Sequence, residues 1–221
     1  GGDPGYPGVA GPMTLPPQKA PKRLVFLETT GWGKVSPALR SAMEQAFAKL
    51  TAAGVEIINR SMSADVAATE EAITDSLRIT REVNCWESRW PLNIYAERDA
   101  SKLSPEMQAR AKEAASMTPD QYRAACARRD SIRATYAKLK NSGDAIITLS
   151  AVGVAPVGLN STGDPAFAVP GSLLGVPALS LPLFTEGGLP VGLQLMGFEQ
   201  CDADLFAIAR SVQEIVGQVA V

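Results

Sequence analysis

Serine side chains are the groups of this chain that could supply a nucleophile. The candidates lie in or beside a Gly/Pro-rich part of the sequence, at Ser150, Ser161, Ser172 and Ser180. A serine hydroxyl attacks a carbonyl only when a neighbouring base accepts its proton. Because the chain has no histidine, that base would have to be a lysine held neutral by burial. The lysines lie on predicted exposed faces or connectors, where an ammonium stays protonated, so the sequence argues against a Ser–Lys pair within the chain.

The absence of histidine removes further chemistries. Ser-His-Asp and Cys-His catalysis, His-ligated zinc and the His-carboxylate iron site are all excluded within this sequence. Cys85, Cys126 and Cys201 are odd in number, far apart and without a CxxC motif. This pattern indicates free thiols in a reducing compartment, and hence a cytoplasmic protein. No GxGxxG follows a predicted strand and no P-loop motif occurs, so neither a metal nor a cofactor is predicted.

Composition and charge restrict the class of protein. Of the 221 residues, 46% are hydrophobic and 20% charged, and the formal net charge is −2. This is a globular mixture, enough for one large domain or two small ones. The near-neutral charge argues against a sequence-independent grip on nucleic acid, which needs a basic excess. Gly, Pro or a charge interrupts each apolar run before it could span a membrane, so neither nucleic acid nor membrane is an expected partner.

The elements that would position these side chains begin with a strand-helix-strand unit. Leu24–Leu27 and Val55–Ile58 are short apolar runs that predict buried strands. Between them, Ser36 and Pro37 are typical of a helix start, and Gly54 is typical of the position just after a helix. Two strands joined through a helix by short links predict a parallel pair.

A helical excursion is expected next, at residues 60–142. The sequence predicts three helix starts there, at Asp65, Ser104 and Thr118. Pro91 is expected to stop the first of these helices, because proline lacks the N–H that continues a helix. Gln121 would complete a capping box with Thr118.

The chain then returns to strands. The expected strands are Ala145–Leu149, Ala178–Leu183 and Val191–Met196. The last two flank a turn at Glu186–Gly188. Asp202 is expected to cap a final helix that ends near Val216, with a buried face formed by Leu205, Ile208, Ala209 and Val212.

Three patterns allow both a functional and a structural interpretation. The loops Thr162–Pro165 and Gly171–Gly175 could cradle an anion or oxyanion, although tight turns and close strand packing are the favoured explanation. The third predicted helix is basic, and a face paired with local carboxylates is favoured over an anion contact. Its cations are Arg123, Arg128, Arg129, Arg133 and Lys138. Trp86 and Trp90 would share one helix face as core or interface anchors.

Three segments near the C-terminus form a specific pattern. They are Thr162-Gly163-Asp164-Pro165-Ala166-Phe167, Gly175-Val176-Pro177-Ala178-Leu179-Ser180-Leu181-Pro182 and Gly188–Gly197. With the preceding strand, they resemble the closing region of the amidase signature family. The resemblance is detailed over Asp144–Val216, and the earlier elements occur in the same order in the family. The sequence departs from the family pattern at Leu149, Ala168 and Gly171.

This resemblance implies a fold and a mechanism. The expected fold class is α/β, a portion of the amidase-signature fold with a mixed central sheet covered by helices and a helical excursion. The family hydrolyses amide C–N bonds with a Ser-Ser-Lys triad in a Gly/Ser-rich core, and this chain has no Ser-Ser pair. No catalytic residue is therefore assigned here. Gly2-Asp3-Pro4 matches the sequence that often closes that core, so the chain is expected to follow it.

The resemblance also implies substrate-side residues and an organisation of the chain. Thr162, Gly163, Phe167 and Ser172 are expected to contact substrate, whereas Asp164 is expected to hold its own loop turn. Four segments of one larger amidase domain are expected: a connector at 1–23, strand-helix-strand at 24–59, the helical excursion at 60–142, and the sheet strands, pocket loop and final helix at 143–221.

The predicted function is that of the C-terminal portion of an amidase that cleaves the C–N bond of a small or medium acyl amide. The expected partners are the N-terminal catalytic half of the enzyme, a small-molecule amide and a second copy in a homodimer. One alternative is a non-catalytic binding module with this fold, and another is an amidotransferase-type subunit that passes ammonia to an acceptor. Because buried strands need cover on both faces, the isolated chain is expected to expose apolar sheet edge and aggregate.

Overall fold

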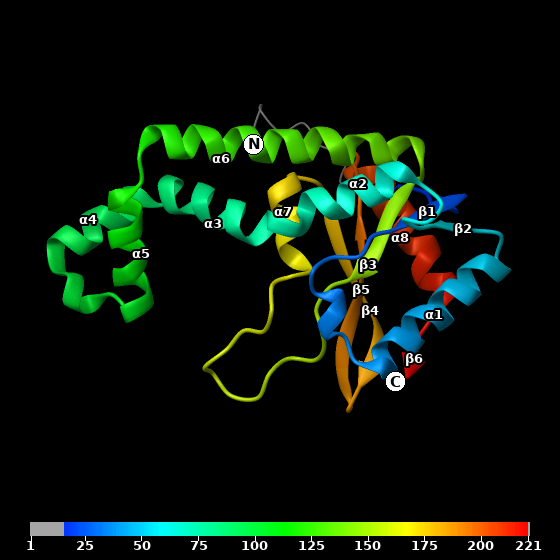
Figure 1. The fold of residues 1–221 in the computed structure, drawn as a ribbon. Helices are drawn as coiled ribbons and strands as arrows, with labels where there is room; N and C mark the ends of the chain where they lie inside the picture. The colour runs from blue at the N-terminus through cyan, green and yellow to red at the C-terminus, as the bar shows by residue number, and fades with distance from the viewer. Residues whose placement is uncertain (1–15, 221) are drawn as a thin grey trace.

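A mixed sheet of six strands lies at the centre of residues 16–220, the part of the chain that the computed structural model describes. The strand order is β2-β1-β3-β5-β4-β6 (Figure 1). The strands are β1 (Arg23–Phe26), β2 (Glu56–Ile58), β3 (Ala145–Leu149), β4 (Ala178–Glu186), β5 (Leu189–Met196) and β6 (Val219–Ala220). The expected α/β class with a mixed sheet is confirmed. The segment matching the close of the catalytic core, Gly2–Pro4, lies outside the described residues.

The sheet has a parallel part and an antiparallel part. β1 pairs in parallel with both β2 and β3, as the strand-helix-strand pattern predicts. β3 and β4 each pair antiparallel with β5. The β4–β5 hairpin turns at Gly187 and Gly188, whose φ angles of 58° and 80° suit glycine and tight hairpin turns. Glu186 belongs to β4 and pairs with Leu189, so the turn is shorter than expected.

Helices α1 (Pro37–Ala52) and α8 (Asp202–Val216) cover one face of the sheet. Ser36 caps α1, because its Oγ accepts the N–H of Leu39 at 3.1 Å. The predicted buried face of α8 is confirmed, and it packs into a core with alternate strand residues. That core includes Leu24, Leu39, Met43, Ile147, Leu149, Phe184, Leu193, Leu195, Ile208 and Val212.

The start of α8 differs from the expectation. Cys201 is the N-cap residue and makes no side-chain capping bond. Asp202 is the first helical residue instead. Its carboxylate therefore lies in the first turn, where it complements the positive end of the helix dipole rather than capping an N–H group.

The opposite face of the sheet carries α2 (Ala64–Ala72), α3 (Ser76–Glu87), α6 (Pro119–Ala137) and α7 (Ala168–Leu174). α6 begins with the predicted capping box of Thr118 and Gln121. Tyr136 joins α6 to the sheet side by donating its hydroxyl to the Gly197 carbonyl at 2.7 Å. This second core includes Val25, Val66, Ile79, Ile132, Leu139, Ile146, Leu173 and Met196.

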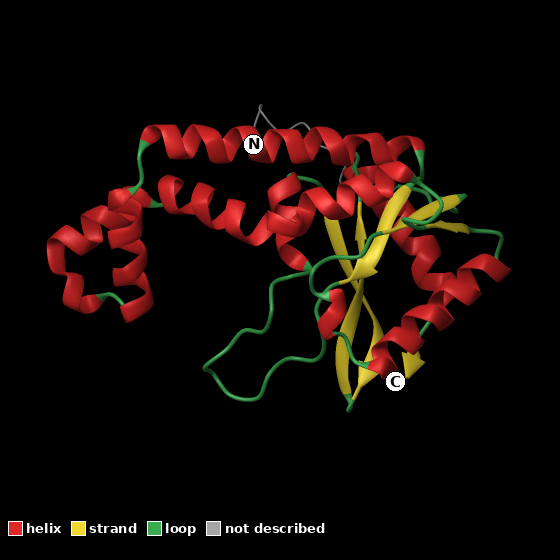
Figure 2. Cartoon of the chain, viewed as in Figure 1, coloured by secondary structure: helices red, strands yellow, loops and turns green. Residues whose placement is uncertain are grey.

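Two further helices form an arm that extends from α3 away from the sheet (Figures 1 and 2). They are α4 (Arg89–Asp99) and α5 (Pro105–Ser116). Short 3-10 turns complete the chain: η2 (Trp32–Lys34), η3 (Ile73–Asp75), η4 (Ala100–Lys102) and η5 (Lys138–Asn141). Between β2 and β3 the chain is therefore entirely helical apart from its connecting loops.

The junction of α3 and α4 overturns two expectations. Pro91 does not stop a helix: α3 already ends at Glu87, and Pro91 lies near the start of α4, where its fixed φ suits the first turn. Trp90 before it is extended, as residues preceding proline tend to be. Trp90 is 75% exposed, whereas Trp86 stacks on Tyr122 of α6 with ring centroids 5.2 Å apart. The two tryptophans therefore do not share a buried face.

Most of the basic side chains of α6 have partners within the described part of the chain. Arg123, Arg128 and Arg129 pair with carboxylates, on Asp120, Glu82 and Asp130 in that order. Arg133 instead donates from Nε to the Leu173 carbonyl at 2.9 Å. The favoured interpretation, a solvated face paired with local carboxylates, is confirmed for these three pairs, and Arg133 holds α7 against α6.

β4 leaves one edge and one face open. β6 pairs only with Phe184 and Thr185, and within residues 16–220 no other strand pairs with that edge. Exposure alternates along the rest of β4, where Ala178, Ser180 and Pro182 are exposed. This strand is therefore covered on its α8 side and bare on the other.

Candidate functional site

A band of polar side chains crosses the sheet on the face that carries α7. Thr148 of β3 lies opposite Gln194 of β5, which in turn lies opposite Ser180 of β4. Ser150 follows Thr148 by two residues and so points to the same side of the sheet. Its Oγ lies 2.7 Å from the Oγ of Ser180. The Thr148 side chain is buried, and its Oγ1 has no hydrogen-bond partner among the described residues. We call Thr148, Ser150, Ser180 and Gln194 the polar band.

Gly192 makes room for the two serines. A Cβ at this position would lie 2.1 Å from the Ser180 Oγ and 2.5 Å from the Ser150 Oγ. The backbone holds the same arrangement, because the Ser150 N–H donates to the Gly192 carbonyl at 2.8 Å. Both serines are nucleophile candidates in the sequence, but their contact across 30 residues of chain was not predicted. The available signal was a glycine inside an otherwise apolar strand, which often marks a close approach.

The serine pair has no neighbouring base in the described part of the chain. The lysine amino groups that make hydrogen bonds there contact Asp204, Asp164 and the Val216 carbonyl. None of them reaches a serine hydroxyl. The two hydroxyls can therefore donate and accept hydrogen bonds, but the residues around them do not activate a nucleophile.

Phe167 anchors the start of α7 against the polar band. Its ring is fully buried and meets Trp32 edge to face, with centroids 6.2 Å apart. Gly31 lies so close that an added Cβ would approach the Phe167 ring to 2.8 Å. The Phe167 carbonyl accepts a hydrogen bond from Gln194 Nε2 at 3.1 Å. Among the predicted substrate-side residues, Phe167 is therefore an anchor within the core, whereas Ser172 is exposed on α7.

The loop before α7 carries the other predicted site residues. Thr162 and Gly163 are exposed, and the positive φ of Gly163, 96°, favours glycine. Asp164 accepts the Ala166 N–H at 2.9 Å, which confirms its predicted turn role. It also pairs with Lys34 at 2.5 Å. The hydrogen bond from Lys34, followed by that from the Ala166 N–H, lowers the pKa of the Asp164 carboxyl.

A second polar cluster lies at the carboxyl end of β1. Glu70 of α2 is buried, and its Oε1 accepts the Glu28 N–H at 2.8 Å. Arg60 lies 3.2 Å from the other carboxyl oxygen. Burial raises the pKa of the Glu70 carboxyl, while the Glu28 N–H and Arg60 act in the opposite direction. This group ties α2 to the carboxyl end of β1.

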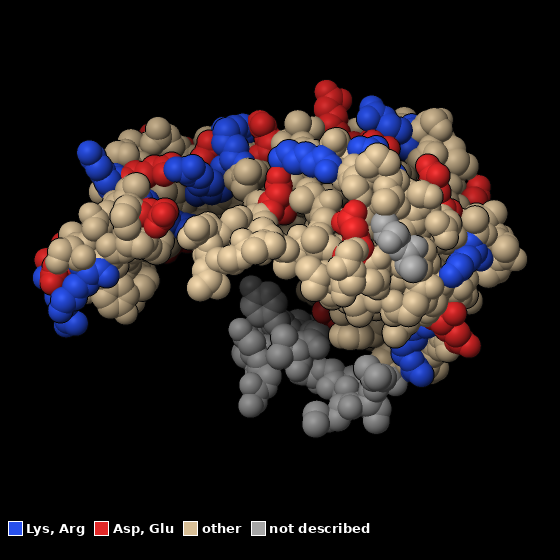
Figure 3. All heavy atoms as spheres, turned by 90° about the horizontal axis from the view of Figure 1, so that it is seen from below, with Lys and Arg blue, Asp and Glu red and all other residues tan. Residues whose placement is uncertain are grey.

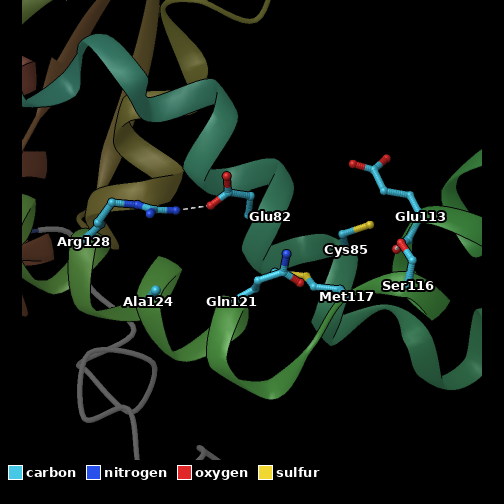
Figure 4. A pocket seen from close by; sticks show the side chains of 8 residues that line it. All are labelled: Glu82, Cys85, Glu113, Ser116, Met117, Gln121, Ala124 and Arg128. Atoms are coloured by element: carbon cyan, nitrogen blue, oxygen red, sulfur yellow. Dashed lines mark hydrogen bonds and ion pairs between the residues drawn. The ribbon is translucent and has the colours of Figure 1, made fainter.

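A cavity of about 310 Å³ lies in the helical region between α3, α5 and α6 (Figure 4). Glu82 and Arg128 form an ion pair across it, and Gln121 is engaged in the capping box. Cys85 is buried at its wall, where burial raises the pKa of the thiol. Most polar side chains of this cavity thus already have a partner within the chain, and we call it the paired cavity.

Charged side chains are unevenly distributed over the surface. Seen from below, Lys, Arg, Asp and Glu gather over the helical arm and the outer rim, with an uncharged stretch between them (Figure 3). Among the described residues, no three His, Cys, Asp or Glu side chains are grouped as a metal site. No helix among them is long and apolar enough to cross a membrane.

Known proteins resemble this chain in sequence pattern and in fold. The family model for amidases matches residues 12–206. A crystal structure of an amidase superposes with a TM-score of 0.75 at 21% identity, covering 95% of this chain and 49% of that one. The peptide amidase from Stenotrophomonas maltophilia superposes with a TM-score of 0.62 at 19% identity, covering 89% and 43%. The chain thus spans about half the length of these solved proteins.

Curated relatives match over shorter stretches. A fatty acid amide hydrolase from Medicago truncatula is 40% identical over 53 residues, 24% of this chain and 9% of that protein. A glutamyl-tRNA(Gln) amidotransferase subunit from Hahella chejuensis is 35% identical over 99 residues, 42% of this chain and 20% of that one. With the family model matched over most of its length and the fold shared with solved amidases, this chain belongs to the amidase signature family.

Proposed function

We propose that this chain is one portion of an amide hydrolase and forms the substrate side of its active site. The catalytic Ser-Ser-Lys triad lies outside residues 1–221 in this proposal. The observation that supports this proposal is the polar band, in which two paired hydroxyls lie on an open sheet face with no base beside them. Such a surface can orient an amide by hydrogen bonds but needs a nucleophile and a base from elsewhere.

The residues of this chain would position the substrate in three ways. Thr162, Gly163 and Ser172 are exposed around the start of α7 and contact the acyl amide. Phe167 holds that region in place from within the core. The uncharged loop and the exposed side chains of β4 exclude water from the scissile bond when the site is complete, which strengthens its hydrogen bonds. The substrate is a small or medium acyl amide.

The open edge of β4 is the docking surface for the N-terminal catalytic half. Ala178 and Pro182 are exposed there without charge, and an unpaired edge offers backbone hydrogen bonds to a further strand. Residues 1–23 connect the two halves in this arrangement, and the four predicted segments form one larger domain. A second copy of the chain would compete for the same edge, and the composition of the purified material separates the two occupants. The free thiols favour a cytoplasmic location.

A second candidate function is the transfer of ammonia from glutamine to an acceptor. It is favoured by one observation, the recurrence of glutamyl-tRNA(Gln) amidotransferase subunits among the relatives, such as that of Rubrobacter xylanophilus at 48% identity over 50 residues. In this case the polar band would orient the side-chain amide of glutamine. The chain would then need acceptor-binding partners.

The test is purification of the C-terminally tagged chain from its natural source. The expected material contains the catalytic half and releases ammonia from acyl amides, and a fluorophosphonate abolishes this activity. Strong preference for glutamine, with an acceptor present, would select the amidotransferase function. A single species of 23.3 kDa, as monomer or homodimer, that hydrolyses no amide would overturn the proposal and favour the non-catalytic binding module.

A further inference from the structure

A second cavity, of about 550 Å³, lies between α3, α5 and α7. It shares Cys85 and Glu113 with the paired cavity but opens on the side of α7, where Val169 forms part of its wall. Val169 lies between Phe167 and Ser172, two of the predicted substrate-side residues. Its size is within the usual range for small-molecule sites. We call it the arm cavity.

Two helices present regular stripes to the arm cavity. On α3, Leu77, Thr80 and Asn84 follow one another at spacings of three and four residues, which places them on one face. On α5, Ala109 and Arg110 also line the cavity. The cavity is thus lined by aliphatic side chains and hydrogen-bond donors from α3 and α5, and by Val169 of α7.

Three donors that line the arm cavity have no partner for their side chains within residues 16–220. The Thr80 Oγ1 is shielded from solvent and makes no hydrogen bond. The Asn84 amide and the Arg110 guanidinium also line the cavity without a hydrogen bond or ion pair to the described chain. Buried polar groups are normally satisfied, so the shielded Thr80 hydroxyl indicates a missing hydrogen-bond partner in the cavity. Asn84 is exposed and Arg110 half-buried, so their side chains are accessible to a ligand in the same cavity. In the paired cavity, by contrast, Glu82 and Arg128 satisfy each other.

The charges around the arm cavity favour an anion near Arg110. Four charged side chains line it: Arg81, Glu106, Arg110 and Glu113. Arg81 and Glu113 neutralise each other at 2.6 Å. Glu106 is exposed and keeps its hydration, whereas Arg110 is half-buried and so gains more from a counter-ion. A planar guanidinium matches a carboxylate through two parallel hydrogen bonds.

We propose that the arm cavity binds a carboxylate at the far end of the amide substrate. Arg110, Thr80 and Asn84 hold the carboxylate, and Leu77 and Val169 contact the methylene chain that links it to the amide. This inference rests on the proposed function and narrows its substrate to acyl amides with a remote carboxylate. It assigns selectivity to the cavity between α3, α5 and α7 rather than to the polar band.

Binding is tested first, with probes that contain no amide and cannot be turned over. Pentanoate and pentan-1-ol are titrated by calorimetry into the tagged material isolated from the natural source. Pentanoate is expected to bind, and pentan-1-ol about tenfold or more weakly, because only the anion pairs with Arg110. Arg110→Ala is expected to remove this preference and Arg110→Lys to restore part of it. Arg98→Ala, which removes an arginine of the arm outside the cavity, serves as the matched control.

Filling the cavity is the second variant. Leu77→Trp is expected to abolish pentanoate binding, whereas Ala124→Trp, in the wall of the paired cavity, leaves it unchanged. Circular dichroism and the thermal midpoint verify that each variant is folded. Equal binding of both probes, or unchanged pentanoate binding in folded Arg110→Ala, would overturn the carboxylate site.

Turnover then tests whether that carboxylate belongs to the substrate. Adipamic acid is expected to exceed hexanamide in kcat/KM, and Arg110→Ala to remove the difference mainly through KM. Pentanoate binding without any preference for adipamic acid would contradict the substrate assignment. Because pentanoate binding does not require the triad, a failure of amide hydrolysis and a failure of this site give different results.

Discussion

The two faces of the sheet are completed to different extents. On the α1–α8 face, apolar side chains run from β1 to β6 and are covered within this chain. On the α7 face, the apolar residues Ile146 and Met196 give way to the polar band and then to exposed side chains of β4. One face is thus a complete core, whereas the other combines a partial core with an exposed surface that is available for contacts. The α1–α8 face therefore mainly stabilises this chain, whereas the exposed part of the α7 face carries its proposed function.

The largest expected loss of stability is on the α1–α8 face. Phe184 is fully buried there, on β4. Phe184→Ala removes a large buried ring and leaves a cavity, so we expect the free energy of unfolding to fall by about 3–5 kcal/mol. Urea denaturation followed by circular dichroism measures this loss. Unchanged stability would mean that the α1–α8 face is not the principal core.

A smaller effect is expected in the polar band. Gly192→Ala places a methyl group against both serine hydroxyls and is expected to cost about 1–3 kcal/mol. Ser180→Ala in the same background removes the closer hydroxyl and should recover part of the loss. The double variant, measured by the same denaturation, tests whether the two serines meet at Gly192. Additive losses would contradict that geometry.

The smallest effect concerns pH and the Glu70 cluster. Because burial raises the pKa of Glu70, the folded chain holds this proton more tightly than the unfolded chain does. Its contribution is therefore most favourable below the unfolded pKa and is lost as pH rises through that value towards the folded pKa. Glu70→Gln, which keeps an acceptor for the Glu28 N–H, should flatten this part of the stability profile. Unfolding series between pH 4 and 7 compare the two proteins, and an unchanged slope would contradict this assignment.

Local signals in the sequence were enough for most of the elements. Ser36 and Thr118 mark helix starts by capping chemistry, and Gly187-Gly188 marks the hairpin, because these effects act within a few residues. The Pro91 prediction was wrong because proline fits the first turn of a helix as well as it ends one. Which of these roles it takes depends on how α4 joins α3, which the local pattern does not contain.

The candidate site was less predictable because it depends on distant pairing. The contact between Ser150 and Ser180 follows from the register of three strands. Phe167 fits a motif, but its burial depends on contacts with Trp32 and Gly31, which lie more than 130 residues earlier in the chain. The nearby Lys34–Asp164 pair spans a similar separation of 130 residues. The arm cavity likewise needs three helices to be in place. Such contacts leave only a weak trace, such as an isolated glycine, in a single sequence.

The most direct test of the central claim is labelling with a fluorophosphonate, which reacts with activated serines. The material purified from the natural source is labelled, digested and analysed by mass spectrometry. We expect the label on a serine outside residues 1–221 and none on this chain, because Ser150 and Ser180 lack a base. A stoichiometric adduct on Ser150, Ser180 or any other serine of this chain would contradict the account.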